Sequence, residues 1–285
     1  MQTYEFNPSS AMPLERSHAG FEFDHASNPV GTRLDEPRQP VIRGFIIHLE
    51  RARDRMPQVE RLAARLPVPS EIIEAVDGRV LSVGEVERVY RRRLQKPYYP
   101  FAMSIGEIAC FLSHRKAWAA IVEQGIDAGL VFEDDVEIDD AFRVAFAAAK
   151  ACLKPGSFIR FPFRMGKEHG KCVLSEGETN VIQPTRIGLG MVAQLVSRDA
   201  AIRLLEATSI FDRPVDTTVQ MSWFTRVSPL AVLPGGVHEI SPQLGGSTIK
   251  SHKTLAERLS REVLRPLYRA KIVFHSRRFI RDAIS

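Results

Sequence analysis

Three consecutive carboxylates, Glu133, Asp134 and Asp135, are the residues of this sequence best suited to chemistry. They follow an apolar run that is typical of a buried strand, and ligands of open α/β sheets bind where such strands end. Adjacent negative charges repel one another, and a hard divalent cation with oxygen ligands would relieve the repulsion and bridge to a diphosphate. The pattern equally fits a solvated loop in which Asp139 or Asp140 caps the next helix. This stretch alone leaves both interpretations open.

Polar residues also follow two other predicted strands. The arginine-rich segment 50 to 55 comes after a strand predicted at 44 to 49, and arginines there can form forked hydrogen bonds with phosphate. A solvated first helical turn explains the same segment, and we favour that interpretation when the segment is taken alone. Asp77 and Gly78 follow a strand predicted at 71 to 76, where an Asp-Gly pair indicates a turn first.

Asp216 is the remaining candidate for chemistry. It lies where a helix predicted at 217 to 224 begins. A carboxylate in that place either caps the helix or, if it faces a substrate, acts as a base. The sequence supports both roles.

The composition is that of an ordinary folded protein, with 285 residues, 44% hydrophobic and 26% charged. No apolar run approaches the roughly 20 residues of a membrane span, and the start of the chain lacks the pattern of a signal peptide. The three cysteines, at 110, 152 and 172, have no metal-ligand spacing, which indicates reduced thiols and a cytoplasmic protein. Nucleic acid is not an expected partner, because no aromatic-plus-basic binding motif is present.

The candidate residues need a domain to position them, and we predict it over residues 41 to 250. Residues 1 to 40 are polar and are predicted to be a disordered extension. Ser104 and Glu107 have the form of a capping box at the start of a helix that reaches about residue 124. We expect further helices at 54–66, 83–96, 141–152 and 197–206, strands at 130–132, 157–161 and 227–232, and a loop or hairpin at 164–180.

The C-terminal segment, 251 to 285, is predicted to be a basic amphipathic helix. Residues 250 to 285 contain ten Lys/Arg and three Asp/Glu, a net charge of +7, whereas the whole chain carries +5. A basic amphipathic helix is typical of attachment to an anionic membrane surface. Packing against the domain with a solvated basic face is the alternative.

Four segments resemble glycosyltransferase family 25, which includes bacterial lipopolysaccharide galactosyltransferases and is related to collagen galactosyltransferases. They are 45–51 (FIIHLER), 75–78 (AVDG), 106–118 (GEIACFLSHRKAW) and 130–136 (LVFEDDV), with a weaker fifth from 195–201 (LVSRDAA) to 214–216 (PVD). Glu50 stands where Asp is usual in the family, and Ala109 where Gly is usual. Neither departure removes a carboxylate of the acid cluster.

The resemblance implies a GT-A type α/β fold, with a mixed, mainly parallel central sheet flanked by helices. It also implies a UDP-hexose donor and a divalent metal, Mn2+ or Mg2+. By this analogy the acid cluster is the counterpart of the DxD motif: Asp135 binds the metal, Glu133 contacts the metal or the ribose, and Asp134 belongs to the donor site. The other residues expected near the donor are Arg51, Asp77, Gly78, Ser113 and His114.

The function that these observations favour is transfer of a hexose to a lipopolysaccharide core or related glycan at the cytoplasmic face of the inner membrane. Galactose from UDP-galactose is the expected sugar, and Asp216 is the candidate base for an inverting displacement. A haloacid-dehalogenase-like phosphatase is a weaker reading, because its Asp-x-Asp-x-Thr/Val pattern is absent. The other alternative is a non-catalytic nucleotide-sugar-binding or membrane-associated protein with the same fold.

Overall fold

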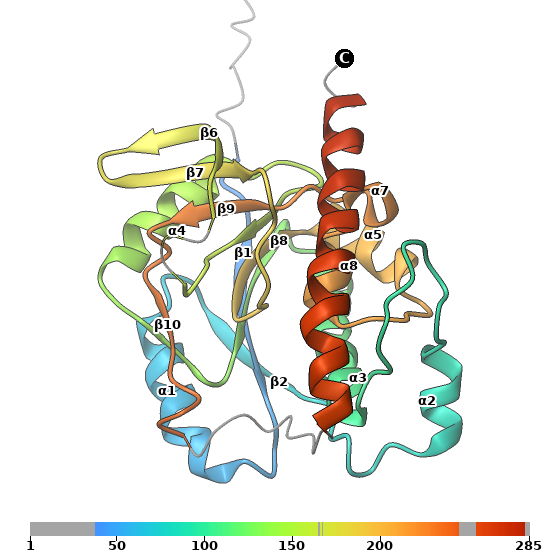
Figure 1. Ribbon diagram of the computed structural model, residues 1–285. Coiled ribbons are helices and arrows are strands. Elements are labelled where there is room, and N and C mark those ends of the chain that lie inside the picture. Colours follow the sequence, from blue (N-terminus) through green and yellow to red (C-terminus); the bar gives the residue numbers. More distant parts are fainter. Residues whose placement is uncertain (1–37, 165, 167, 245–254, 283–285) are drawn as a thin grey trace, which may run out of the picture. The chain divides into compact units, whose positions relative to one another are not determined.

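A mixed eight-stranded sheet forms the centre of the chain in the computed structural model, which describes residues 38–282 except 165, 167 and 245–254 (Figure 1). Its strand order is β2-β1-β3-β8-β5-β9-β7-β6. The strands are β1 (Ile42–His48), β2 (Ser70–Glu74), β3 (Ala128–Glu133), β5 (Phe158–Arg160), β6 (Gly170–Glu176), β7 (Thr179–Pro184), β8 (Ala193–Ser197) and β9 (Leu230–Leu233).

The strand directions confirm a mixed sheet. β2, β1 and β3 are mutually parallel, and β5 pairs in parallel with β9. β8 lies antiparallel between β3 and β5, while β7 pairs antiparallel with both β9 and β6. Six strands therefore share one direction, although the reversed β8 and β7 make most of the neighbouring pairs antiparallel.

Helices cover both faces of the sheet, which confirms the α/β class. On one face, α1 (Met56–Arg65) and α4 (Ala141–Ala151) pack over a core that includes Leu130 and Phe132 of β3. On the other face, α3 (Ile105–Glu123) and α5 (Arg198–Ala207) pack over a core that includes Val131. The alternating side chains of β3 are thus buried on both sides, which explains why this strand is a continuous apolar run.

The predicted capping box is present at the start of α3. The Ser104 side chain accepts from the backbone N–H of Glu107, and the Glu107 carboxylate accepts from Ser104 in return. These reciprocal bonds satisfy helix N–H groups that lack partners within the helix. They fix the end of α3 that lies nearest the loop after β2.

Two predicted helices were wrong in extent. The basic helix expected at 83–96 is α2 (Val83–Val89) only, because Tyr90 forms a β-bridge with Phe211 and Arg91 donates to the Phe211 carbonyl. The helix expected at 217–224 is two short helices, α6 (Val215–Val219) and α7 (Ser222–Thr225). Sequence periodicity does not encode either interruption, since each depends on distant packing or a local turn.

Two smaller features flank the sheet. The segment 164–180 contributes to the β6–β7 hairpin, and β4 (Val136–Ile138) pairs with β10 (Val237–Glu239) directly after the acid cluster. The short 3-10 helix η1 (Arg53–Arg55) precedes α1. The N-cap residue of α4 is Asp140, whose side chain makes no capping hydrogen bond, whereas Asp139 accepts from the backbone N–H of Ala141. The contact of Asp139 with the first turn of α4 is thus present beside the acid cluster.

The C-terminal segment forms α8 (Leu255–Asp282), and one side of it packs against the domain (Figure 1). Tyr268 and Ile272 are buried with Met221, beside Tyr99 and Trp223. Packing on the domain, one of the two alternatives for this helix, is therefore present. Over the described residues, no helix combines the length and the apolar character of a bilayer-spanning segment.

The described residues from 39 to 282 lie within one compact unit. The predicted extension at 1–40 lies outside the described residues up to position 37.

Candidate functional site

Three loops converge at the carboxyl ends of the parallel strands β1, β2 and β3. They border a cavity of about 190 Å³ that contains most of the residues expected at the donor site. Parallel strands end at the same edge of a sheet, so segments 26 to 86 residues apart in sequence meet there. The candidate residues lining this cavity are Arg51, Gly78, Ser113, His114, Glu133, Asp134 and Asp135.

Asp134 is the most enclosed of the three acids. Its Oδ1 accepts from Arg55 at 2.6 Å, and its Oδ2 lies 2.8 Å from Nδ1 of His48. All three side chains are buried. Asp134 therefore holds together the loops after β1 and β3. The interpretation of segment 50–55 as a solvated helical turn is wrong for Arg55, which is buried in the site.

Asp135 carries the largest electrostatic perturbation of the acid cluster. Burial, reinforced by the charges of Glu133 and Asp134, raises its pKa to about 7, and Arg55 at 3.4 Å only partly opposes this. A cation bound beside Asp135 would compensate its negative charge, which burial and the charges of Glu133 and Asp134 otherwise disfavour. The carboxylate oxygens of Glu133 and Asp135 are ligands of the kind that Mg2+ and Mn2+ prefer, so the residues fit such a metal.

Glu133 is oriented by a chain of side chains that begins on β8. The amide Nε2 of Gln194 lies 3.4 Å from Nδ1 of His114, and Nε2 of His114 lies 3.2 Å from the Glu133 carboxylate. With the amide as donor, His114 carries its proton on Nε2 and donates to Glu133. Gln194 and His114 are buried, so this chain fixes the carboxylate from behind.

Cys110 adds a second, overlapping ligand set. Ligand atoms of Cys110, His114 and Glu133 lie within 4.8 Å of one another. Thiolate and imidazole suit zinc, whereas paired carboxylates suit Mg2+ or Mn2+. A zinc ion in the set with Cys110 would take both His114 and Glu133 as ligands and replace their mutual contact. A hard cation on Glu133 and Asp135 would leave that contact in place.

Arg51 and Asp77 are joined across the loops after β1 and β2. The Arg51 Nε donates to Asp77 Oδ2 at 2.7 Å, and the backbone N–H of Arg79 donates to the other oxygen at 2.9 Å. The Arg79 N–H, together with Arg51, lowers the pKa of Asp77. Gly78, the next residue in this loop, packs against the N-terminal end of α3. A Cβ atom at position 78 would lie 3.2 Å from the Ile105 carbonyl oxygen.

Ser113 positions this loop rather than only facing the cavity. Its hydroxyl accepts from the Val76 N–H at 2.8 Å and donates to the Ala109 carbonyl at 2.8 Å. The loop that carries Asp77 and Gly78 is thereby attached to the middle of α3.

A second cavity of about 470 Å³ adjoins the first and contains Asp216. Cys110, Glu133 and Glu239 line both cavities, so the two form one cleft with the acid cluster at their junction. Asp216 accepts from the Gly190 N–H and the Thr217 hydroxyl, both at 3.2 Å. It lies in the first turn of α6, whose N-cap is Pro214, so the N-cap role considered from sequence is wrong.

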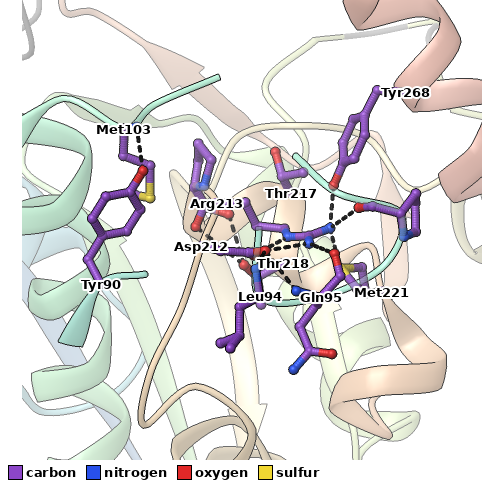
Figure 2. Close-up of polar contacts among 12 residues, drawn as sticks. Tyr90, Leu94, Gln95, Met103, Asp212, Arg213, Thr217, Thr218, Met221 and Tyr268 are labelled. Carbon is purple, nitrogen blue, oxygen red and sulfur yellow. Dashed lines mark hydrogen bonds and ion pairs between the residues drawn. The ribbon is translucent and has the colours of Figure 1, made fainter. Parts of the chain in front are cut away.

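A buried arginine fixes the wall of the larger cavity (Figure 2). Arg213, 1% exposed, pairs with Asp212 at 2.6 Å and 2.9 Å and donates to the carbonyl of Gln95 at 2.6 Å. It also donates to the Tyr268 hydroxyl at 2.5 Å. Burial raises the pKa of Tyr268 to about 12, so this hydroxyl stays neutral. Arg213 thus connects the segment before Asp216 to α8.

Sequence reasoning missed several residues of this cleft. His48 lies within an apolar strand, and Cys110 and Glu239 have no motif that separates them from ordinary packing or loop residues. The Asp-Arg-Pro run at 212–214 is typical of a loop, although it contains the buried Asp212–Arg213 pair that also binds Tyr268 of α8. The capping serine and the 106–118 motif were the only available signals for the α3 side.

Comparison with known proteins places these features in a family. Residues 41–219 match "Glycosyltransferase family 25 (LPS biosynthesis protein)". A "Glycosyltransferase 25 family member" of Drosophila pseudoobscura pseudoobscura is 37% identical over 102 residues, which are 35% of this chain and 16% of that protein. "Procollagen galactosyltransferase 1" of Danio rerio is 35% identical over 102 residues, 35% of this chain and 17% of that protein.

A third relative is the "Probable inactive glycosyltransferase 25 family member 3" of Rattus norvegicus. It is 32% identical over 126 residues, which are 42% of this chain and 21% of that protein. The chain thus spans between 16% and 21% of the length of these three relatives. The family match, in contrast, extends over more than half of the chain, from β1 to α6. The chain belongs to glycosyltransferase family 25.

Proposed function

We propose that this protein transfers a hexose from a UDP-sugar to a glycan acceptor by an inverting, metal-assisted displacement in a GT-A type fold. The observation that carries the proposal is the junction of two cavities at Glu133, with metal-compatible carboxylates on one side and Asp216 on the other. The smaller cavity takes the nucleotide diphosphate, and the larger one takes the acceptor. The sugar lies between them.

Glu133 and Asp135 are the residues that hold the divalent metal, Mn2+ or Mg2+. When bound, such a metal neutralises the negative charge that develops on the departing diphosphate. Asp134, whose oxygens bind Arg55 and His48, orients the acid cluster from the protein side. His114 keeps Glu133 in place.

Arg51, Asp77 and Gly78 are proposed to contact the nucleotide. Arg51 is 35% exposed and presents further N–H donors to an anion beyond the one that binds Asp77. Gly78 has no side chain, which permits close approach of the backbone to a ligand. Ser113 keeps this loop in position through Val76.

Asp216 is proposed to remove the proton of the attacking acceptor hydroxyl. Its two oxygens each accept one hydrogen bond, from Gly190 and Thr217, which orients the carboxylate within the cavity wall. A carboxylate oxygen has further lone-pair capacity to receive a proton. In a single displacement this transfer accompanies attack on the anomeric carbon and gives inversion.

Galactose is the proposed sugar, because a relative is named a procollagen galactosyltransferase. A lipopolysaccharide core or related glycan is the proposed acceptor, supported by the family's description as an LPS biosynthesis protein. The basic character of residues 250–285 supports action at the anionic cytoplasmic face of the inner membrane.

A non-catalytic nucleotide-sugar-binding protein is the second candidate. One observation favours it, namely that a relative is named as probably inactive. Such a protein would bind the donor and metal without turnover on any acceptor.

The test is calorimetric titration of UDP-galactose, UDP-glucose and UDP-N-acetylglucosamine, each with Mn2+ and with chelator. We expect one UDP-sugar to bind tightly only with Mn2+, and the Asp135→Asn variant to lose at least about tenfold in this affinity. Asp140→Asn is the matched control, because the Asp140 side chain is fully exposed and does not line either cavity.

Equal metal-dependent affinity in the Asp135→Asn variant would refute the metal assignment. Sugar transfer to a glycan, measured with the same samples, separates the two candidate functions. Binding without transfer to any glycan in a panel would favour the non-catalytic protein.

A further inference from the structure

We propose that the acceptor carries an anionic substituent, a phosphate or a sugar carboxylate, and that an arginine cluster at the outer part of the larger cavity binds it. The arginine cluster consists of Arg164, Arg186, Arg265 and Arg269. This inference rests on the proposed assignment of the larger cavity to the acceptor. It adds the chemical class of that acceptor.

The cluster surrounds two contiguous cavities. The outer cavity, of about 310 Å³, adjoins the larger cavity that contains Asp216. The two share Phe163, Arg164, Leu189, Gln220 and Arg269. Arg186 lines only the outer cavity of these two, and Arg265 only the larger one. An extended ligand that reaches Asp216 can therefore place a second group among the arginines.

The positive charges of the cluster lie close to one another. Burial, followed by the charges of Arg186 and Arg265, lowers the pKa of Arg269, and Asp216 opposes this shift more weakly. Like charges gathered around a cavity favour an anionic ligand, which removes their mutual repulsion.

The nearby carboxylate is already engaged. Glu168 is the acidic residue that lines the outer cavity, and both of its oxygens accept from Arg160, at 2.8 Å and 3.0 Å. Both side chains of this pair are 5% exposed. Glu168 therefore neutralises Arg160 beneath the cavity, and among the described residues no other carboxylate lines the outer cavity.

The cluster is also built on fixed elements. Gln220 donates to the Ile187 carbonyl at 2.6 Å, and Arg160 donates to the carbonyls of Leu189 and Gly190, so the loop after Arg186 is held at several points. The bond between Arg213 and Tyr268 attaches α8 between Arg265 and Arg269 (Figure 2).

Two of the guanidinium groups rest on aromatic rings. Arg164 lies 4.8 Å from the centroid of Phe163, and Arg265 lies 5.9 Å from that of Phe101. A planar guanidinium that stacks on a ring keeps its N–H edge available for a forked bond to phosphate or carboxylate. The cluster thus has the geometry for an oxyanion as well as the charge.

The experiment measures binding of glucose 6-phosphate, glucuronate and glucose to the full chain at saturating UDP and Mn2+. Saturation keeps the diphosphate of the nucleotide from competing for the cluster. We expect the two anionic sugars to bind at least about tenfold more tightly than glucose. The double variant Arg186→Ala/Arg269→Ala is expected to lose that preference by about tenfold to a hundredfold.

Arg88→Ala/Arg92→Ala is the matched control, since it removes the same charge from exposed positions that line none of these cavities. The proposal is overturned if glucose binds as well as the anionic sugars, or if the two double variants behave alike. Failure of UDP and Mn2+ to bind the wild type, measured first, would instead count against the proposed function.

A second arm uses vesicles of phosphatidylcholine with and without phosphatidylglycerol. Loss of vesicle binding in Arg186→Ala/Arg269→Ala, with binding of the sugar anions unchanged, would assign the cluster to a membrane and overturn the proposal. Retained vesicle binding with loss of the sugar anions is the expected result.

Discussion

Two buried arginine–aspartate pairs stand at opposite ends of the cleft and are built differently. Arg213 has a full set of acceptors, including Asp212, two backbone carbonyls and the Tyr268 hydroxyl. Arg55 instead faces Asp134 and Asp135, beside Glu133, so negative charge is in excess. The charge of Arg213 is paired, whereas the three carboxylates of the acid cluster outnumber the one arginine that faces them.

This difference separates a pair that stabilises the structure from a cluster that is suited to bind a ligand. A fully satisfied buried pair makes its segment rigid and offers no site to a ligand. An excess of buried carboxylate costs stability, and the cost is removed only when a proton or a metal binds. We therefore assign Arg213 to holding α8 and the wall of the larger cavity, and we propose ligand binding for the acid cluster.

The largest expected effect is on the complete pair. Arg213→Ala leaves Asp212 buried without its partner, and we expect a loss of about 3–5 kcal/mol in the free energy of unfolding. Urea denaturation measures this. The control is Arg203→Ala, whose exposed pair with Asp199 on α5 is expected to contribute less than about 1 kcal/mol. Similar losses in both variants would contradict the comparison.

In the acid cluster, removing a charge should raise the free energy of unfolding rather than lower it. Because the pKa of Asp135 is raised from 3.8 to about 7, its contribution to stability is complete below about pH 4 and is lost as the pH rises through 7. Asp135→Asn removes that loss. Without metal, the variant should exceed the wild type by about 2–4 kcal/mol at pH 8 and show little difference near pH 4.

Thermal and urea denaturation across pH 4–8, with chelator present, provide the measurement. Mn2+ should then stabilise the wild type and leave Asp135→Asn nearly unchanged, which reduces the difference at pH 8. A variant less stable than the wild type at pH 8 in chelator would show that Asp135 is a structural group like Asp212.

The smallest expected effect concerns Ser113, which holds the loop that carries Asp77 and Gly78. Ser113→Ala leaves the Val76 N–H without its acceptor, and we expect a loss of about 1 kcal/mol in stability. The loop of Asp77 and Gly78 should loosen as well, which weakens binding of the UDP-sugar by a few fold. Ser175→Ala, on the exposed β6 strand, is the control. Unchanged affinity would limit Ser113 to packing of α3.

Much of the fold was predictable because its signals are local. The apolar run of β3, the capping box of Ser104 and Glu107, and the alternation of strands and helices each lie within a short window. The boundary at Val89 was not predictable, since a bridge from Tyr90 to Phe211, more than a hundred residues away, ends α2. The reversed direction of β8 has no signal in its own sequence either.

The site was predictable to the same extent. Glu133, Asp134 and Asp135 were found because three acids end an apolar strand, and motif resemblance added Ser113 and His114. Arg55 was misjudged because its partner Asp134 lies 79 residues further along the chain. The pairing of Arg213 with Tyr268 spans 55 residues, and no spacing rule relates them.

The position of β8 has a consequence for how such proteins diversify. Apart from Glu239 on β10, the walls of the smaller cavity come from residues before β4, whereas most walls of the larger cavity come from residues after β5. β8 pairs with β3 on one side and with β5 on the other, and Gln194 on this strand reaches back to His114. Under the proposed function, we expect recombination that exchanges the second half of the chain to change the acceptor and to keep the donor. It would succeed only where the incoming β8 keeps its register with β3.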